Sequence, residues 1–492
     1  MNKKTLILSC LALLGLASCG GQAGNDPTDS LTTDSEGNVV FDNVKLRVWS
    51  VIGDPDRAYL EMVNSSFNDL YADRGIQATI TPIVNGDYYT QLANVINTDP
   101  DNAPDVIIFH SERLTKLAHD NIIVPMEEYF DLAKSPFDEN DYLSNVMAEC
   151  RYDGKIYGVP LDVHAGVWYV RSDILEKNGL SKPSSLSEWI DVCNALIKLN
   201  DEGKLWHRAM DATKPAAGDW VQSRLPNFYP IVMSDTGGIE NGWIPQTAVF
   251  QNGGELTDDK GYPAWNTEGL LDVITMFRNW QSGEGYEGKF VGPGQSAETV
   301  WTNLASGNAV FSCEGPWWVE QRLDEYETAL GERTDSDGKT YQPLDIMNMS
   351  KLFAMDEGTD CASEIYGVGH CFSISRTCDS NQKRAAAAIY SEYMTSHSAA
   401  YMQGGHLPAC KSVLSSDQYL NSDFYARYLD EFGNPEDFHM LGNTPYYSEV
   451  YETLKYVYTD IFSANKTEMT PKQIIDTRYN EALQAIRSAE EL

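Results

Sequence analysis

Residues 155–171 read KIYGVPLDVHAGVWYVR, and the rest of the chain is organised around this stretch. Residues 155–161 predict a short buried strand, and residues 166–170 predict a second strand rich in β-forming side chains. Asp162 and His164 lie between the two strands. A polar break between two apolar strands indicates that the backbone crosses here from one domain to another. We therefore expect two lobes hinged at this stretch, with a binding cleft between them.

The length and charge of the chain narrow the class of protein. A chain of 492 residues is too long for one hydrophobic core, so two or more domains are expected. It carries 36 Lys and Arg against 72 Asp and Glu, a net charge of -36, which argues against binding to nucleic acid or to anionic lipid surfaces. The 11 Trp and 27 Tyr, against 16 Phe, suit a wet cleft in which a ring face stacks and a polar edge forms hydrogen bonds.

The first residues of the chain have the pattern of a processing signal. Residues 1–18 combine a positive end with an apolar run that is too short to span a membrane. The sequence LASC at residues 16–19 resembles the lipobox of bacterial lipoproteins, which implies that Cys19 is lipidated. An ordinary secretory peptide is the alternative. Residues 19–42 then form the lipidated end and a flexible tether rich in small and polar residues.

Seven cysteines remain once Cys10 and Cys19 are set aside. An odd number cannot all pair, and no CxxC motif is present, so most are expected to be small buried hydrophobic residues. A disulfide from Cys371 to either Cys361 or Cys378 stays open as an alternative. The spacing of His and Cys does not match a zinc site, so no metal is expected.

The first third of the chain alternates strands and helices. The predicted strands are residues 44–51, 78–84 and 103–109, and the predicted helices are residues 56–68, 87–97 and 113–120. This alternation predicts a doubly wound α/β lobe, whose ligands bind beyond the carboxyl ends of the strands. Those ends are residues 50–54, 85–89 and 110–113.

The remainder of the chain predicts a second lobe and a second crossing. Residues 365–369 are interpreted as that crossing, and residues 404–409 as a loop that returns to the cleft. The predicted helices in this part are residues 187–200, 269–282, 298–306 and 382–395, and the predicted strands are residues 308–312 and 371–375. Loops are predicted at residues 219–238, 242–254 and 327–345. The chain after residue 409 is expected to be helical. The expected domains are a first lobe of residues 43–161 and 368–402, and a second lobe of residues 162–367 and 403–492.

Several motifs occur in an order that resembles one known family. They are the lipobox, DVIIFHSERL, the 155–171 stretch, NLASGNAVFSCEGPWWV, YGVGHCFSI and GGHLPACKSVL. Together they resemble the extracellular solute-binding proteins of ABC importers, specifically the carbohydrate-binding cluster that includes the maltodextrin-binding type. The resemblance covers essentially all of the mature chain. It implies a periplasmic-binding-protein-like fold of two α/β lobes that close on a sugar and present it to permease subunits in the membrane, with no catalysis, no cofactor and a monomeric chain.

The resemblance also implies a set of ligand-binding residues. The loops after the first and third strands supply Ser50, Asp54, Phe109, Ser111, Glu112 and Arg113. His164 stands where relatives often carry an acidic sugar ligand, and Trp317 follows Gly-Pro as the stacking aromatic of the family does. The remaining candidates are Asp87, Asp162, Trp220, Trp243, Tyr366, Gly405 and His406.

These residue types suit a sugar, because aromatic rings cover its C–H face and charged groups bind its hydroxyls. The candidate residues also have structural explanations. Phe109 and the tryptophans could belong to the hydrophobic core, and Glu112 could stabilise the start of a helix. Asp162 could cap a turn, and His164 could be a buried histidine whose hydrogen bonds are all made within the protein. Of the adjacent Trp317 and Trp318, only Trp317 is expected to face the ligand. Two other functions stay open: a secreted glycoside hydrolase or lyase with paired carboxylates, and the same fold binding a polyamine, a peptide or another small solute.

Overall fold

A computed structural model of the chain describes residues 27, 29, 31–83, 85–208, 219–234, 240–292, 296–318, 333–334, 338–341, 347–352, 354–355, 358–421, 435, 438–462 and 468–491. The predicted signal, Cys19 and most of the predicted loop 327–345 lie outside these residues. Within them, no helix is both long enough and apolar enough to cross a membrane.

The first lobe is built around a sheet with the strand order β2-β1-β3-β18-β4, with β7 (Val159–Pro160) also paired to β18. Its strands are β1 (Val44–Ser50), β2 (Ile76–Pro82), β3 (Val106–His110), β18 (His370–Ser375) and β4 (Ile123–Val124). β1 is parallel to β2 and β3, whereas β18 is antiparallel to β3. The predicted strands of this lobe are correct to within a few residues.

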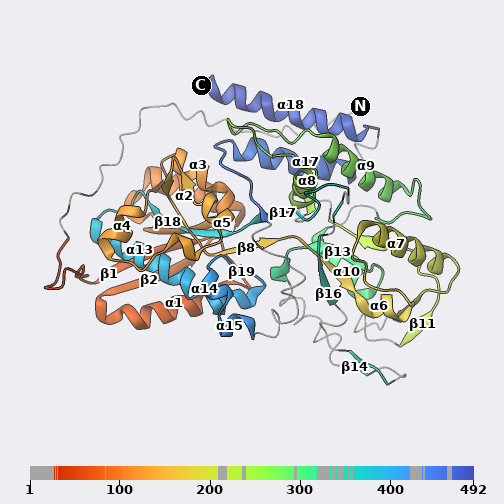
Figure 1. Cartoon of the computed structure of the whole chain (residues 1–492), viewed down its shortest axis with the longest axis horizontal. Coiled ribbons are helices and arrows are strands. Elements are labelled where there is room, and N and C mark those ends of the chain that lie inside the picture. The colour runs from red at the N-terminus through yellow and green to blue at the C-terminus, as the bar shows by residue number, and fades with distance from the viewer. Residues whose placement is uncertain are drawn as a thin grey trace, which may run out of the picture.

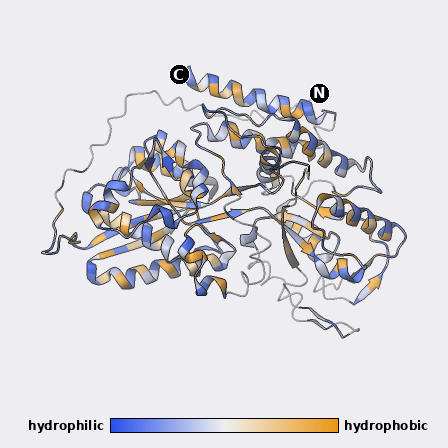
Figure 2. Cartoon of the chain, in the orientation of Figure 1, coloured by the Kyte–Doolittle hydropathy of each residue, from blue (hydrophilic) through white to orange (hydrophobic). Residues whose placement is uncertain are grey.

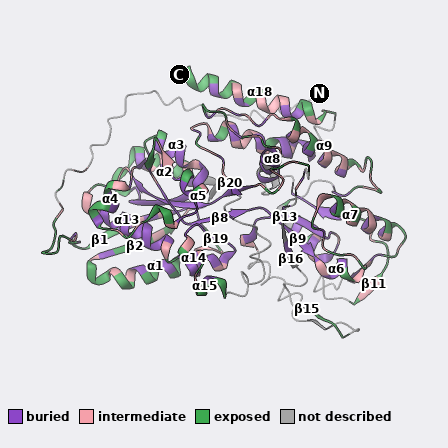
Figure 3. Ribbon diagram, viewed as in Figure 1, coloured by how far each residue is buried: buried purple, intermediate pink, exposed green. Residues whose placement is uncertain are grey.

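Helices lie on both sides of this sheet (Figure 1). They are α1 (Arg57–Tyr71), α2 (Asn85–Thr98), α3 (Leu114–His119), α4 (Glu127–Ala133) and α13 (Asn381–Ser396). The four consecutive alanines 385–388 of α13 are fully buried, because their small side chains let the helix pack closely against β1 and α4. The central strands β3 and β18 are almost entirely buried, and Figure 3 shows exposed residues along the outer faces of the helices.

The second lobe is built around a smaller sheet with the order β12-β13-β9-β16. Its strands are β12 (Ile231–Val232), β13 (Phe311–Glu314), β9 (Val167–Arg171) and β16 (Met347–Lys351). The helices α6 (Ser172–Lys177), α7 (Leu186–Asp201) and α10 (Ala297–Ser306) accompany it. Buried Arg171 forms an ion pair with Asp173 at 2.9 Å and donates to the carbonyl of Leu304 at 2.7 Å, which joins β9 to the end of α10.

A third sheet, with the order β19-β8-β17-β20, runs between the lobes (Figure 1). Its strands are β19 (Leu407–Pro408), β8 (Asp162–Ala165), β17 (Ile365–Val368) and β20 (Phe438–His439). The prediction that Asp162 and His164 lie between two strands is therefore wrong, because both residues lie within the strand β8. Burial in a strand is tolerated here because partners from distant parts of the chain satisfy these polar side chains.

A layer of helices flanks the second lobe: α8 (Glu240–Gln251), α9 (Glu268–Ser282), α17 (Thr453–Phe462) and α18 (Pro471–Glu490). Apolar and polar residues alternate along α18 with the period of an amphipathic helix (Figure 2). The prediction of a loop at 242–254 is wrong, because most of it belongs to α8. Buried Trp243, Ile244 and Val249 outweigh the helix-breaking effect of Pro245.

After residue 409 the described chain is less uniformly helical than predicted, because it includes the strand β20. The short helix η6 (Ser398–Gly404) packs on α1, and α15 (Asp417–Leu420) packs on η6. The helix η6 therefore packs on a helix of the first lobe, whereas the sequence analysis assigns residues from 403 onwards to the second lobe. After β20, a π-helical turn at Ser448–Glu452 precedes α17.

All seven cysteines among the described residues are free thiols, and six of them are buried. The alternative disulfides from Cys371 to Cys361 or Cys378 are not formed. Cys371 lies beside the thiol of Cys150 instead, and burial raises the pKa of Cys371 well above its usual value. The interpretation of most cysteines as small buried hydrophobic residues is confirmed.

Candidate functional site

A cavity of about 990 Å³ lies between the two lobes. The first lobe lines it with residues 51–57 after β1, with Pro82 and Ile83 at the end of β2, and with His110, Glu112 and Arg113 after β3. These are the carboxyl ends of parallel strands, where ligands of open α/β sheets bind. The crossing sheet and the second lobe complete the wall with His164, Trp243, Trp317, Trp318 and residues of the 447–455 segment.

One wall of the cavity combines aromatic rings with ionised side chains. The guanidinium of Arg113 lies 4.1 Å from the ring centres of both Tyr89 and Tyr447, so it is held between two aromatic faces. Its Nη2 is 3.9 Å from a carboxylate oxygen of Glu452. Tyr447 in turn stacks on Tyr451 with ring centres 5.0 Å apart. This packing fixes the position of a cation that would otherwise be flexible.

Glu112 is a buried acid beside this wall. Its Oε1 is 3.5 Å from the hydroxyl of Tyr447, and its Oε2 has no hydrogen-bond partner among the described residues. Burial raises the pKa of Glu112 to about 7, although Arg113 opposes the rise. Near neutral pH the carboxyl group is therefore able to donate as well as to accept a hydrogen bond.

The floor of the cavity is a polar cluster centred on Asp162. The carboxylate accepts from the His370 backbone N–H at 2.6 Å, from the Tyr401 hydroxyl at 3.0 Å, and lies 3.0 Å from Nδ1 of both His370 and His406. Burial alone would raise the pKa of Asp162, but His370 and His406 hold that pKa well below its usual value. On its other side, His406 Nε2 is 3.2 Å from Asp56.

The histidines of this floor differ in charge. Burial tends to lower the pKa of His406, but Asp56 and Asp162 outweigh it and raise that pKa to about 10. Burial lowers the pKa of His164 well below its usual value, so this imidazole is neutral. The ring of Trp317 meets His164 edge-on at 4.6 Å and lies parallel to His406 at 6.1 Å. The floor therefore presents a cation, a neutral imidazole and an indole side by side.

Residues 66–423 match the family model of the bacterial extracellular solute-binding proteins. The chain belongs to this family. Its members are substrate-binding proteins and not enzymes, and the family is extracellular, as the sequence predicts.

Solved structures of two-lobed sugar-binding proteins share the fold of this solute-binding protein. The GacH receptor of Streptomyces glaucescens has a TM-score of 0.66 at 12% identity, covering 89% of this chain and 97% of its own. The sugar-binding protein MalE from Xanthomonas citri has a TM-score of 0.65 at 18% identity, covering 91% and 99%. An ABC substrate-binding protein from Listeria monocytogenes has a TM-score of 0.65 at 15% identity, covering 90% and 99%. The predicted fold class is confirmed.

Seven of the residues singled out in the sequence line the cavity of this solute-binding protein. They are Asp54, Glu112, Arg113, His164, Trp243, Trp317 and His406. The prediction that Trp318 faces away is wrong, because the short 3₁₀ turn Pro316–Trp318 brings both indoles to the cavity. Gly405 does not line the cavity, but its φ of 93° and its close approach to the Pro316 carbonyl place His406 beneath Trp317.

Other predicted residues have structural roles. Phe109 and Tyr366 are fully buried in the core, which is the structural alternative named for Phe109. The Ser50 hydroxyl accepts from the Ile52 N–H at 3.0 Å, and that of Ser111 accepts from the Gly369 N–H at 3.2 Å, so both secure strand ends. Trp220, on β11 (Trp220–Gln222), packs on the Arg208 guanidinium at 4.3 Å. Asp162 lies beneath the cavity, and the side chain of Asp87 lies outside the described residues.

Sequence reasoning missed Asp56, His370 and the 447–455 segment. Tyr89 and His110 also line the cavity; they lie within the strand ends predicted at 85–89 and 110–113, but neither was singled out as a ligand-binding residue. The segment carried a signal, since Tyr447, Tyr451 and Lys455 are spaced by four and so share one helical face. His370 directly follows the predicted crossing at 365–369, and extending that crossing by one residue would have included it.

Proposed function

We propose that this solute-binding protein captures an oligosaccharide in the cavity between its lobes and delivers it to the permease of an ABC importer. The observation that carries the proposal is that three indoles and several acidic and basic side chains line one cavity. Trp243, Trp317 and Trp318 offer faces for the C–H surface of a sugar, while Asp54, Glu112 and Arg113 offer hydrogen bonds to its hydroxyls.

The size of the cavity and the ligands of structural neighbours support an oligosaccharide. Its volume of about 990 Å³ is at the upper end of small-molecule pockets. The GacH receptor has been solved with acarbose, and the Listeria protein with cycloalternan. We propose a ligand of the same chemical class here.

We further propose that the lobes move about the crossing sheet when a ligand binds. The first lobe comprises residues 43–161 and 368–421 in this proposal, and the second comprises residues 162–367 and 438–491. Closure is favoured only by contacts that the ligand makes with both lobes, such as Arg113 on one side and Trp317 on the other. A lipid on Cys19 would hold the monomeric protein outside the cytoplasmic membrane, near the permease.

A thermal-shift screen against mono- and oligosaccharides tests the ligand class. A sugar that binds only the folded state raises the melting temperature. We expect Trp317→Ala to reduce the affinity for that sugar by about 10-fold or more, because it removes a stacking face. Trp220→Ala is the matched control, since Trp220 lies outside the cavity. If polyamines raise the melting temperature and sugars do not, the protein binds a cationic solute and not a sugar.

A further inference from the structure

Three imidazoles and one carboxylate meet beneath the cavity in an arrangement that the sugar proposal does not require. Asp162, His164, His370 and His406 each offer one ligand atom, and all four atoms lie within 4.8 Å of one another. All four residues are buried, with exposures of 0 to 7%. They come from all three passages of the chain near the hinge: β8, the start of β18, and the loop before β19.

The spacing of these atoms is that of a four-coordinate site. A tetrahedral zinc ion with bonds near 2.0–2.1 Å separates its ligand atoms by about 3.3–3.4 Å. Here Asp162 Oδ2 is 3.0 Å from Nδ1 of both His370 and His406 and 3.9 Å from Nδ1 of His164. The Nδ1 atoms of His164 and His406 are 3.4 Å apart. Small movements bring all four atoms to one ion.

The surroundings of the cluster hold its members as metal ligands are usually held. Ligating histidines commonly donate their second ring N–H to a carboxylate, and His406 Nε2 faces Asp56 at 3.2 Å while its Nδ1 faces the cluster. The Asp162 carboxylate is oriented by the His370 backbone N–H at 2.6 Å and the Tyr401 hydroxyl at 3.0 Å. His164, His370 and His406 line the cavity, which gives an ion a route of entry.

We propose that Asp162, His164, His370 and His406 form a binding site for a divalent transition-metal ion of the zinc class at the hinge. Imidazole and carboxylate ligands favour such an ion over Mg²⁺ or Ca²⁺, which prefer oxygen ligands alone. The ion takes the place of protons held between the imidazoles and Asp162. It ties the three passages of the chain together. Sequence spacing carries no signal of this site, since its ligands span residues 162 to 406.

The affinity for Zn²⁺ tests the proposal directly. Protein without a histidine tag is stripped with a chelator, and the binding of Zn²⁺ alone is measured by competition with a chromogenic chelator. We expect one ion per chain. His370→Asn should weaken binding by more than about 100-fold, and Asp56→Asn, which removes only the support of His406, by about 10- to 100-fold. His439→Gln removes a half-exposed histidine outside the cluster and should change nothing. Less than one ion per chain, or equal affinity in all variants, overturns the proposal.

A measurement on the wild-type protein keeps the proposal testable even where a buried variant fails to fold. Co²⁺ in a four-coordinate site of nitrogen and oxygen ligands gives strong visible absorption, whereas six-coordinate Co²⁺ gives weak bands. We expect the strong spectrum, saturating at one equivalent and displaced by Zn²⁺. A weak six-coordinate spectrum overturns the site. Because no sugar is present, these results are independent of the proposed ligand.

Discussion

Glu149 is a buried acid whose ionisation we expect to make the stability of this protein depend on pH. It lies at the end of α5 (Ser144–Glu149) and accepts from the Gly442 N–H at 3.0 Å. Burial raises the pKa of Glu149 from 4.5 to about 7, and the nearby Glu112 adds to the rise. The folded protein therefore holds this proton more tightly than the unfolded chain does. The resulting stabilisation is fully present below pH 4.5 and is lost as the pH rises through about 7.

We expect the free energy of unfolding to fall by roughly 1–3 kcal/mol between pH 5 and pH 8 on account of Glu149. Glu149→Gln should remove this part of the pH dependence, because the amide cannot ionise. Urea unfolding at both pH values measures the effect, with the exposed Glu202→Gln as control. The same fall in wild type and Glu149→Gln would show that Glu149 is not the group responsible.

At the scale of single residues, the sequence predicted which residues lie near the cleft better than it predicted the side chains that they contact. Asp162, His164 and His406 were predicted as cleft residues from the polar break and from the order of motifs. Their contacts were not predicted, because Asp162 lies 208 residues from His370 and 239 from Tyr401 along the chain. Local pattern carries no information on which distant side chain satisfies a buried carboxylate. Ser50 and Phe109 were predicted to bind the ligand, but they are buried at or near the ends of β1 and β3. The residues that line the cavity follow only one to three positions later, and the sequence does not show where a strand ends to that precision.

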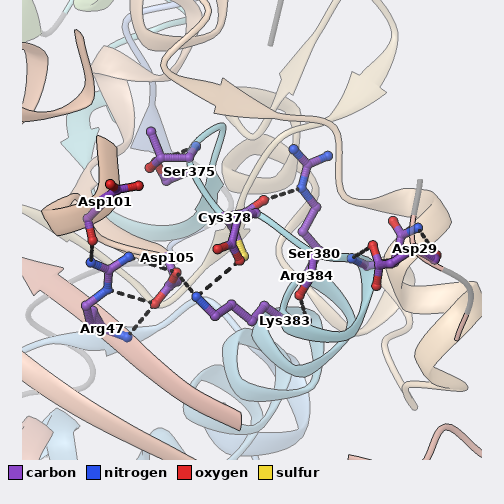
Figure 4. A network of polar contacts seen from close by, with 12 residues as sticks. Asp29, Arg47, Asp101, Asp105, Ser375, Cys378, Ser380, Lys383 and Arg384 are labelled. Carbon is purple, nitrogen blue, oxygen red and sulfur yellow. Dashed lines mark hydrogen bonds and ion pairs between the residues drawn. The ribbon is translucent and has the colours of Figure 1, made fainter. Parts of the chain in front are cut away.

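Secondary-structure elements of the first lobe are joined by a buried acid, Asp105, just before β3 (Figure 4). Its carboxylate accepts from the Arg47 backbone N–H at 2.9 Å and forms an ion pair with Arg47 Nε at 3.2 Å. Lys383 Nζ of α13 approaches the other oxygen at 3.4 Å. The Asp105 carbonyl accepts from the Ser375 N–H at 3.0 Å. One residue thus connects β1, β18 and α13.

We expect Asp105→Asn to lower the free energy of unfolding by roughly 2–4 kcal/mol, because it removes a fully buried charge that two cations and a backbone N–H share. Chemical denaturation of the purified variant measures this loss. Asp101→Asn is the control, since Asp101 meets Arg47 through its backbone carbonyl and lies outside the ion pairs. An equal loss of unfolding free energy in both variants would show that the ion pairs of Asp105 with Arg47 and Lys383 do not account for the effect.

Elements were predictable where local pattern and burial agree. The buried strand β3 and the amphipathic helix α1 follow directly from sequence periodicity. α8 was missed because Gly242 and Pro245 are typical of a loop. In the structure the burial of its apolar side chains stabilises the helix in spite of these residues. β8 was missed because its polar residues break the apolar pattern of a strand, and only tertiary partners make their burial favourable.

At the scale of the whole molecule, the two lobes meet through the crossing sheet and enclose the cavity. The alternation of strands and helices, the polar residues between the apolar segments of 155–171 and the order of the motifs together predicted two lobes joined by crossings of the chain. The packing of η6 against α1 was not predictable, because it depends on contacts between segments that are far apart in the sequence. Arg113 and Trp317 face the cavity from opposite lobes. A ligand that contacts both therefore gains most when the lobes approach each other.

Small-angle X-ray scattering tests this closure. We expect the sugar identified by thermal shift to reduce the radius of gyration of the wild-type protein, because ligand contacts with both lobes favour a closed state. Trp220→Ala should contract as the wild type does. At the same sugar concentration Trp317→Ala should contract less, in proportion to its reduced occupancy, and should recover the contraction when the concentration is raised to saturation. Saturating binding measured by calorimetry without any contraction would mean that the lobes are already closed before the ligand arrives, and the crossing sheet would then be a rigid support and not a hinge.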